Sequence, residues 1–321
     1  MQPVVVSQLE LKNYKGQHDP FNSLYEMTGG AIFLGCNTIG GILKWFADNS
    51  ELNGIKDAAI PDILMFGGIA VPANIEHELR LRIEGIKGRY AHPRAPVKWN
   101  MRDLKSLYEK QGKVEMYTRL QESSREWRRE IFTALAENEV TLIVACIEAY
   151  SADRKIIKAT KEQLTSHSFS NGLMRFGLHV QDRHPDHAQV VLDWPDRSES
   201  KPFDSEYSSA FNRGVTAAGN VPYRCGALVN LRFLDSATYA NMHHSTLLQT
   251  ADLVVGATRE VIECCLGKKE SGQGVDCTRI VRARFRGAPN RIVGFGISVS
   301  SGNKGFSDAV RNSIGGLLYP A

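Results

Sequence analysis

Three aspartates stand in unusually apolar surroundings, and their type and placement suit them to chemistry. Asp48 and Asp193 each end a short run of apolar residues, and Asp252 lies inside the apolar segment 247–255. A carboxylate at the end of a buried strand costs several kcal/mol in desolvation unless it is paired, hydrogen-bonded or bound to a cation. Three carboxylates brought together would repel one another and attract Mg²⁺ or Mn²⁺, hard cations that prefer oxygen ligands.

Each aspartate alone also has an ordinary structural interpretation. An aspartate after a strand commonly begins a turn or caps a helix. Asp252 could form an ion pair with Arg259, which follows seven residues later on the same helix face. Strand ends in an open α/β sheet are where ligand crevices form, so Asp48 and Asp193 would share a site if their strands are neighbours. The combination of the three therefore favours a metal site more than any one of them does.

Hydrophobic periodicity predicts the elements that must position these residues. Apolar runs predict strands over residues 42–48, 63–72, 141–150, 188–195 and 225–234, and Gly-rich strand-like residues over 292–302. Helical spacing predicts helices over 73–90, 102–110, 116–135, 157–178 and 245–265. Strands and helices that alternate in this way predict an α/β fold.

Composition describes a globular chain with no strong bias. The 321 residues are 42% hydrophobic and carry a net charge of only +4, so bulk charge does not indicate a nucleic-acid binder. Six cysteines without CxxC spacing favour reduced thiols and a cytoplasmic protein. The apolar stretch 29–47 is interrupted by glycines, Asn37 and Lys44, which argues against a membrane helix. Its glycines form neither a P-loop nor a GxGxxG pattern, so no nucleotide cofactor is expected.

Several motifs occur in an order that matches a known family. They are Phe46–Ser50, Phe66–Pro72, Pro96–Asn100, Val191–Asp193, Asp235–Ser236 and, most specifically, Leu248–Leu253. In these motifs the chain resembles domain-of-unknown-function family 3800, whose members look like ribonuclease H-type folds with an acidic metal site. The resemblance covers residues 43–266, which leaves an N-terminal extension over 1–42 and a basic, strand-rich segment over 267–321 expected to pack on the core.

The resemblance implies a ribonuclease H-like mixed sheet flanked by helices, and a nuclease that uses Mg²⁺ or Mn²⁺ to hydrolyse phosphodiesters of DNA or RNA. Asp48 would bridge two ions about 4 Å apart, and Asp193 and Asp252 would each hold one of them. Ser50 and Gln249 would support these ligands or contact the substrate.

Cationic and aromatic residues complete the expected nucleic-acid site. Lys98 would offer a positive charge to a backbone phosphate and Trp99 a face to a base or sugar, although a surface lysine and a core-edge tryptophan are equally good interpretations. The basic stretch that contains Arg282, Arg284 and Arg286 predicts a surface for a phosphate backbone. Arginine alternating with apolar residues is also typical of a solvated edge strand.

The chain departs from the family pattern at two positions. Asn49 replaces a glutamate beside the first aspartate, and no acid stands immediately before Lys98. A second ion would then bind weakly, or use Glu51, Glu148 or a substrate phosphate. These departures keep two alternatives open: a catalytically weak or inactive module that binds nucleic acid or a partner on the same fold, and a metal-dependent hydrolase of a small phosphoester.

Histidines occur at two further places that could carry chemistry. The loop 182–187 has residue types found in metal sites, but its spacing matches no standard zinc pattern and a surface loop explains it better. His243 and His244 precede the segment of Asp252, where one of them could act as a general base or proton shuttle. An ordinary loop position is the competing interpretation for both.

Overall fold

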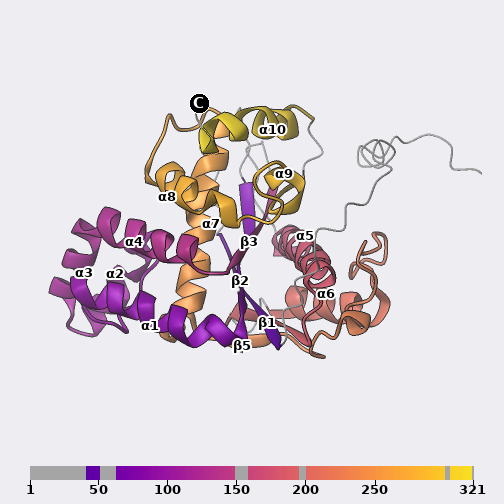
Figure 1. Ribbon diagram of the computed structural model, residues 1–321, viewed down its shortest axis with the longest axis horizontal. Coiled ribbons are helices and arrows are strands. Elements are labelled where there is room, and N and C mark those ends of the chain that lie inside the picture. Colours follow the sequence, from indigo (N-terminus) through magenta and orange to yellow (C-terminus); the bar gives the residue numbers. More distant parts are fainter. Residues whose placement is uncertain (1–40, 51–62, 149–157, 195–199, 301–303, 320–321) are drawn as a thin grey trace, which may run out of the picture. The chain divides into compact units, whose positions relative to one another are not determined.

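The computed structural model describes residues 41–50, 63–148, 158–194, 200–300 and 304–319 (Figure 1). The expected N-terminal extension falls almost wholly outside these residues, and Glu51 also lies outside them. Among the helices that are described, none has the length and apolar character needed to cross a membrane.

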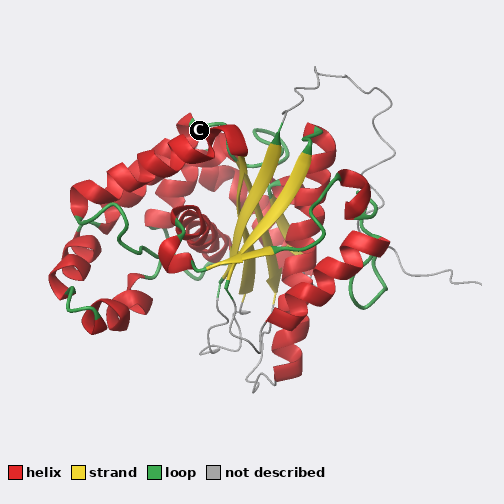
Figure 2. Ribbon diagram, turned by 90° about the horizontal axis from the view of Figure 1, so that it is seen from below, coloured by secondary structure: helices red, strands yellow, loops and turns green. Residues whose placement is uncertain are grey.

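A six-stranded mixed sheet forms the centre of the protein (Figure 2). Its strands are β1 (Ile42–Asn49), β2 (Ile63–Pro72), β3 (Thr141–Glu148), β4 (His187–Asp193), β5 (Thr238–Ala240) and β6 (Ile297–Ser300). They lie in the order β5-β4-β1-β2-β3-β6. β2 runs antiparallel to both of its neighbours, and the remaining pairs are parallel. The predicted α/β class, with a mixed sheet flanked by helices, is confirmed.

Helices cover both faces of this sheet (Figure 2). One face packs against α1 (Ala73–Tyr90), α4 (Ser124–Glu137), α7 (Thr246–Cys265), α8 (Gln273–Val281) and α10 (Lys304–Leu318). The other face packs against α5 (Lys158–Arg183) and α6 (Ser200–Arg213). The helices predicted over 73–90, 157–178 and 245–265 correspond to α1, α5 and α7, because each carries an apolar stripe that the sheet buries.

The strands follow from the same hydrophobic logic. β2 is buried at every position, as its uninterrupted apolar sequence predicts for a central strand covered on both faces. β1 instead divides its side chains between two cores. Leu43, Trp45 and Ala47 face α5 and α6, whereas Phe46 faces the core that contains α7. This alternation decides which way the residues at the end of β1 point.

Two predicted strand segments are corrected by the structure. Residues 225–234 hold the short 3₁₀ helix η3 (Leu228–Leu231) instead of a strand, and the next strand is β5. Gly226 and Arg232 adopt φ angles of 76° and 60°, which turn the chain out of the extended conformation on both sides of η3. The C-terminal segment is mainly helical, with α8, η5 (Arg282–Arg284), α9 (Ile292–Phe295) and α10, and its strand is limited to β6. α8 and α10 pack on α7.

Candidate active site

β1 and β4 place Asp48 and Asp193 at the same edge of the sheet. The two strands are parallel neighbours, and Ala47 is paired with Leu192. Asp48 follows Ala47 and Asp193 follows Leu192. The two carboxylates therefore lie at adjacent positions on neighbouring strands. The condition that their strands be neighbours is therefore met.

The two aspartates also point to the same face of the sheet. Successive side chains of a strand alternate between faces, so Asp48 shares the face of Phe46 and Asp193 shares the face of Val191. Phe46 and Val191 belong to the core that contains α7. α7 carries Asp252, and it packs on β1 and β2. The three aspartates thus converge from β1, β4 and α7, and we call them the acidic site.

A glycine lets α7 lie directly on the sheet beside Asp252. A Cβ atom at Gly68 of β2 would stand 2.7 Å from the Cβ of Ala251, and it would also collide with the carbonyl oxygen of Phe46. No side chain fits at Gly68 unless both the helix and the backbone of β1 move. Gly68 therefore sets the depth at which the neighbour of Ala251, Asp252, reaches the acidic site.

Burial and the charges of neighbouring carboxylates raise the pKa values of two of the three aspartates. Burial raises the pKa of Asp48 well above its usual range, and the charges of Asp252 and Asp193 raise it further. Burial also raises the pKa of Asp252, to about 6, against the lowering effects of Lys98 and of a hydrogen bond from the main chain. The repulsion links the three carboxylates in one electrostatic unit.

Lys98 is the cation of this unit. Burial by itself would lower the pKa of Lys98, but the charges of Asp252, Asp48, Asp103 and Asp193 together raise it. The half-buried ammonium group is therefore close enough to the acidic carboxylates for their charges to act on it. It offsets part of the cost of burying them.

Main-chain hydrogen bonds hold one oxygen of each carboxylate. Asp48 Oδ1 accepts from Asn49 N at 2.8 Å, and Asp252 Oδ2 accepts from Trp99 N at 2.5 Å. Asp193 Oδ1 accepts from Met242 N at 2.7 Å and from its own neighbour in the chain at 2.9 Å. Within the described residues, the second oxygen of each aspartate accepts no hydrogen bond. Three fixed carboxylates thus each keep one oxygen for a ligand.

Trp99 acts on Asp252 through its main chain, while its indole packs against the protein. The ring lies on Gly256 of α7, where an added Cβ would collide with it. The guanidinium of Arg128 lies 4.4 Å from the ring centroid and also donates to the carbonyl oxygen of Trp99. These contacts agree with a core-edge tryptophan, and stacking on a base or sugar stays a prediction.

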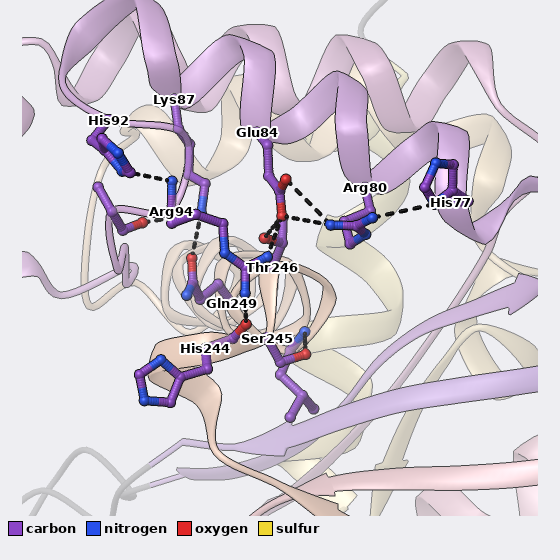
Figure 3. Close-up of polar contacts among 12 residues, drawn as sticks. His77, Arg80, Glu84, Lys87, His92, Arg94, His244, Ser245, Thr246 and Gln249 are labelled. Carbon is purple, nitrogen blue, oxygen red and sulfur yellow. Dashed lines mark hydrogen bonds and ion pairs between the residues drawn. The ribbon is translucent and has the colours of Figure 1, made fainter.

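Gln249 belongs to a buried polar network (Figure 3). The residue is only 2% exposed. Its Oε1 accepts from Lys87 Nζ at 2.9 Å. Its Nε2 donates to the carbonyl oxygens of Met242 and His243 at 2.9 and 3.3 Å. Because Met242 N in turn bonds Asp193, Gln249 supports that carboxylate indirectly and does not face a substrate.

Lys87 is a buried partner of Gln249, and the predictions from the sequence did not include it. It is 1% exposed, and besides Gln249 it donates to the carbonyl oxygen of Ala95 at 3.0 Å. Burial lowers the pKa of its ammonium to about 8. One signal was present in the sequence: Lys87 follows Ile83 by four residues and so lies on the apolar face of its helix.

Ser50 fastens the end of β1 to its surroundings. Its hydroxyl oxygen accepts from Met65 N at 2.9 Å and from Arg259 Nη1 at 3.0 Å. Arg259 also pairs with Glu263 at 3.0 Å, so the ion pair considered for Asp252 is replaced by one within the next turn of α7. Ser50 supports the strand that carries Asp48.

The three arginines proposed for nucleic-acid binding do not form one exposed surface. Arg284 donates two hydrogen bonds to the carbonyl oxygen of Ala136, at 2.9 and 2.7 Å. Arg286 pairs with Asp182 at 2.6 Å, and its side chain is 9% exposed. The structure therefore does not support phosphate binding by Arg284 or Arg286. Arg282 is exposed, and its role stays a prediction.

The histidines take different positions. His243 is half-buried, and burial together with the nearby Lys98 charge lowers its pKa, against the effect of Asp193. Its imidazole is therefore neutral at neutral pH and lies beside the acidic site. In the other histidine-containing loop, the aspartates are used internally, since Asp182 pairs with Arg286 and Asp186 accepts from Gly41 N.

The acidic site has the donors of a metal site without a finished ligand arrangement. In the part of the chain that is described, no three His, Cys, Asp or Glu side chains are grouped so that they could hold a metal ion. The donors themselves are hard carboxylate oxygens, the kind preferred by Mg²⁺ and Mn²⁺. A divalent cation would compete for them with the Lys98 ammonium.

Replacing Asp252 with asparagine is expected to stabilise the metal-free protein at pH 7 by about 3 kcal/mol. The pKa of Asp252 is raised to about 6 in the folded protein, so the wild type loses stability as the pH rises from about 4 to 6. Asparagine does not titrate and keeps an acceptor for Trp99 N. Urea unfolding in EDTA between pH 3.5 and 7.5 measures the difference, which should vanish at the acid end. Asp276→Asn, at an exposed site, should show no such crossover, and an identical pH dependence in Asp252→Asn and wild type would contradict the assignment.

Comparisons with known proteins add no relative. No protein-family model matches the chain, and neither the curated proteins nor the solved structures contain a match.

Proposed function

We propose that the protein is a metal-dependent nuclease that hydrolyses phosphodiester bonds of DNA or RNA at the acidic site. The observation that carries this proposal is the convergence of Asp48, Asp193 and Asp252 on one face of the sheet edge, where burial and repulsion raise the pKa values of Asp48 and Asp252. Buried like charges are costly unless a cation offsets them, and functional sites are where such arrangements concentrate.

The architecture supports a finer assignment of the fold. The mixed six-stranded sheet with helices on both faces is compatible with a ribonuclease H-like fold. We propose that fold for this chain together with its resemblance to domain-of-unknown-function family 3800.

The free oxygens of the three aspartates would hold Mg²⁺ or Mn²⁺, which supplies Lewis acidity and an acidified water when bound. The chain's own residues do the remaining work. Trp99 N and Met242 N keep Asp252 and Asp193 in fixed orientations. Lys98 offers a positive charge to the phosphate that approaches the carboxylates. His243, neutral at neutral pH, is able to accept a proton at the edge of the site.

The direct test is cleavage by the purified protein with a panel of labelled single-stranded and double-stranded DNA, RNA and hybrid substrates. We expect products with Mg²⁺ or Mn²⁺ and none after EDTA is added, because the carboxylates alone supply neither Lewis acid nor activated water. Readdition of Mn²⁺ after EDTA controls for irreversible inactivation. Absence of products from every substrate with either metal would overturn the proposal.

A second function is favoured by one observation, the presence of Lys98 among the carboxylates. A built-in ammonium that already offsets the acidic charges suits a nucleic-acid-binding module without catalysis. In that case binding would persist in EDTA and in Asp252→Asn, and no substrate would be cleaved. The same substrate panel, measured for binding and for cleavage, separates the two functions.

A further inference from the structure

A pocket of about 480 Å³ opens beside the acidic site. Its walls come from residues 92–96, from α2 (Lys105–Lys110) and α3 (Val114–Glu122) with the turn between them, and from His243 and His244 of η4 (Met242–His244). We call it the basic pocket. Its volume lies within the range of about 300–1,000 Å³ that is usual for small-molecule sites.

The charged side chains that line the basic pocket are cationic, and histidines accompany them. Arg94, Lys113 and three histidines line it, and no aspartate or glutamate of the described residues does. Arg94 is held in place by Glu84 at 2.5 Å and by the carbonyl oxygen of His244 at 2.8 Å (Figure 3). Glu84 offsets the charge of Arg94, so the free charge of the wall comes chiefly from Lys113.

Lys113 is placed to meet an anion. The residue is exposed, and its Nζ donates to Gln111 Oε1 at 3.1 Å. It forms no ion pair with any described residue. An ammonium at the rim of a pocket without acids attracts phosphate or carboxylate groups.

The floor of the basic pocket is apolar and aromatic. Tyr108 is buried, and its hydroxyl donates to the carbonyl oxygen of Pro96 at 2.7 Å, which fixes the ring. Leu107 and Met116 contribute half-buried aliphatic surface beside it. A cationic rim over an apolar floor suits a ligand that carries both a phosphate and a flat or sugar-like group.

His243 connects this pocket with the acidic site. It lines the pocket, and it directly follows Met242, whose main-chain N donates to Asp193 Oδ1 at 2.7 Å. A ligand in the pocket and a phosphate at the carboxylates would therefore be neighbours. Consecutive nucleotides of one strand have this relationship.

We propose that the basic pocket binds one nucleotide of a nucleic-acid strand, adjacent to the phosphodiester at the acidic site. The phosphate lies against Lys113 and the base or sugar lies over Tyr108 and Met116. The identity of this ligand rests on the proposed nuclease function. The pocket thus binds a single strand next to the phosphodiester bond that is cleaved.

The test measures binding of labelled six-nucleotide single-stranded DNA and RNA by fluorescence anisotropy in EDTA, where no cleavage occurs. Lys113→Ala should weaken binding about fivefold at low salt, and it should lower the slope of log K against log salt by about 0.7. Met116→Trp, which fills the pocket, should weaken binding at least about tenfold with little change in the slope. Lys110→Ala removes an exposed lysine that does not line the pocket, and it should bind as the wild type does.

Other outcomes would contradict binding of a strand in the basic pocket. Wild-type binding in both Lys113→Ala and Met116→Trp, or equal losses in Lys113→Ala and Lys110→Ala, would overturn it. Because Lys113 is exposed, its variant stays informative if Met116→Trp fails to fold. Competition by free nucleoside monophosphates that Lys113→Ala abolishes would assign the pocket to a free nucleotide and overturn binding of a strand.

Failure of the nuclease function gives a different result. If the oligonucleotide binds and Lys113→Ala weakens that binding, but the wild type cleaves nothing with Mn²⁺, the pocket stands and the nuclease proposal fails. If the wild type cleaves and Lys113→Ala has an unchanged KM and binding affinity, the nuclease stands and the pocket fails.

Discussion

Replacing Asp48 with asparagine is expected to lower the rate of metal-dependent cleavage by at least about 100-fold. Replacing a residue that only supports a metal ligand typically lowers metal affinity or activity about 10–100-fold, and Asp48 would contact the ion itself. It lies at the centre of the acidic site, since both Asp252 and Asp193 raise its pKa. Asparagine keeps the shape and the acceptor for Asn49 N but removes the charge that a cation requires.

Single-turnover cleavage with saturating Mn²⁺ measures this loss, with unfolding measured on the same samples. The raised pKa of Asp48 predicts that Asp48→Asn is at least as stable as the wild type at neutral pH, so unfolding does not explain a lost activity. Asp276→Asn is the matched control, because that aspartate is exposed and pairs with Arg125 and Arg279, which lie outside the acidic site. Equal rates for Asp48→Asn and wild type would show that catalysis takes place elsewhere or not at all.

Replacing Lys98 with methionine is expected to destabilise the metal-free protein by about 2 kcal/mol at pH 7. Removing one partner of a fully buried ion pair costs about 3–5 kcal/mol, and the expected loss is smaller because Lys98 is half-buried. The ammonium offsets the charges of Asp48, Asp193 and Asp252, and methionine preserves the bulk of the stem without the charge. The three carboxylates would then face one another with no cation.

The pH dependence of this loss identifies its cause. Lys98 stays charged throughout the acid range, so its benefit decreases as Asp48 and Asp252 take up protons and the pH falls through their raised pKa values. Unfolding of Lys98→Met and wild type in EDTA should therefore differ at pH 7 and converge near pH 4. Lys105→Met, at an exposed site that pairs with Glu109, should show no convergence. A loss of equal size at both pH values would contradict the electrostatic role.

Added Mn²⁺ provides a second measurement on the same variant. Because Lys98 competes with a divalent cation for the acidic oxygens, Mn²⁺ should stabilise Lys98→Met more than it stabilises the wild type. Mn²⁺ that stabilises neither protein would mean that the acidic site holds no metal, in agreement with the non-catalytic alternative.

Hydrophobic periodicity correctly predicted the elements whose apolar residues are the ones buried in the core. β1, β2, α1 and α7 carry a pattern that the core then buries. The segment 225–234 is apolar enough for a strand, but the positive φ angles of Gly226 and Arg232 are invisible in a hydrophobic pattern. For a related reason the sequence did not show that Arg286 is paired, since its partner, Asp182, lies 104 residues earlier in the chain.

The sequence by itself was enough to predict the three aspartates as site residues and the elements that carry them. A carboxylate inside an apolar run must be desolvated, and this is visible from its neighbours in the chain. The sequence also contained the alternation that turns Asp48 and Asp193 to one face. Only the tertiary structure decided that Lys98 is their cation, that Lys87 supports Gln249 across 162 residues of chain, and that a basic pocket adjoins them. These features join segments far apart in the chain, and charge and packing act through space, so no local pattern records them.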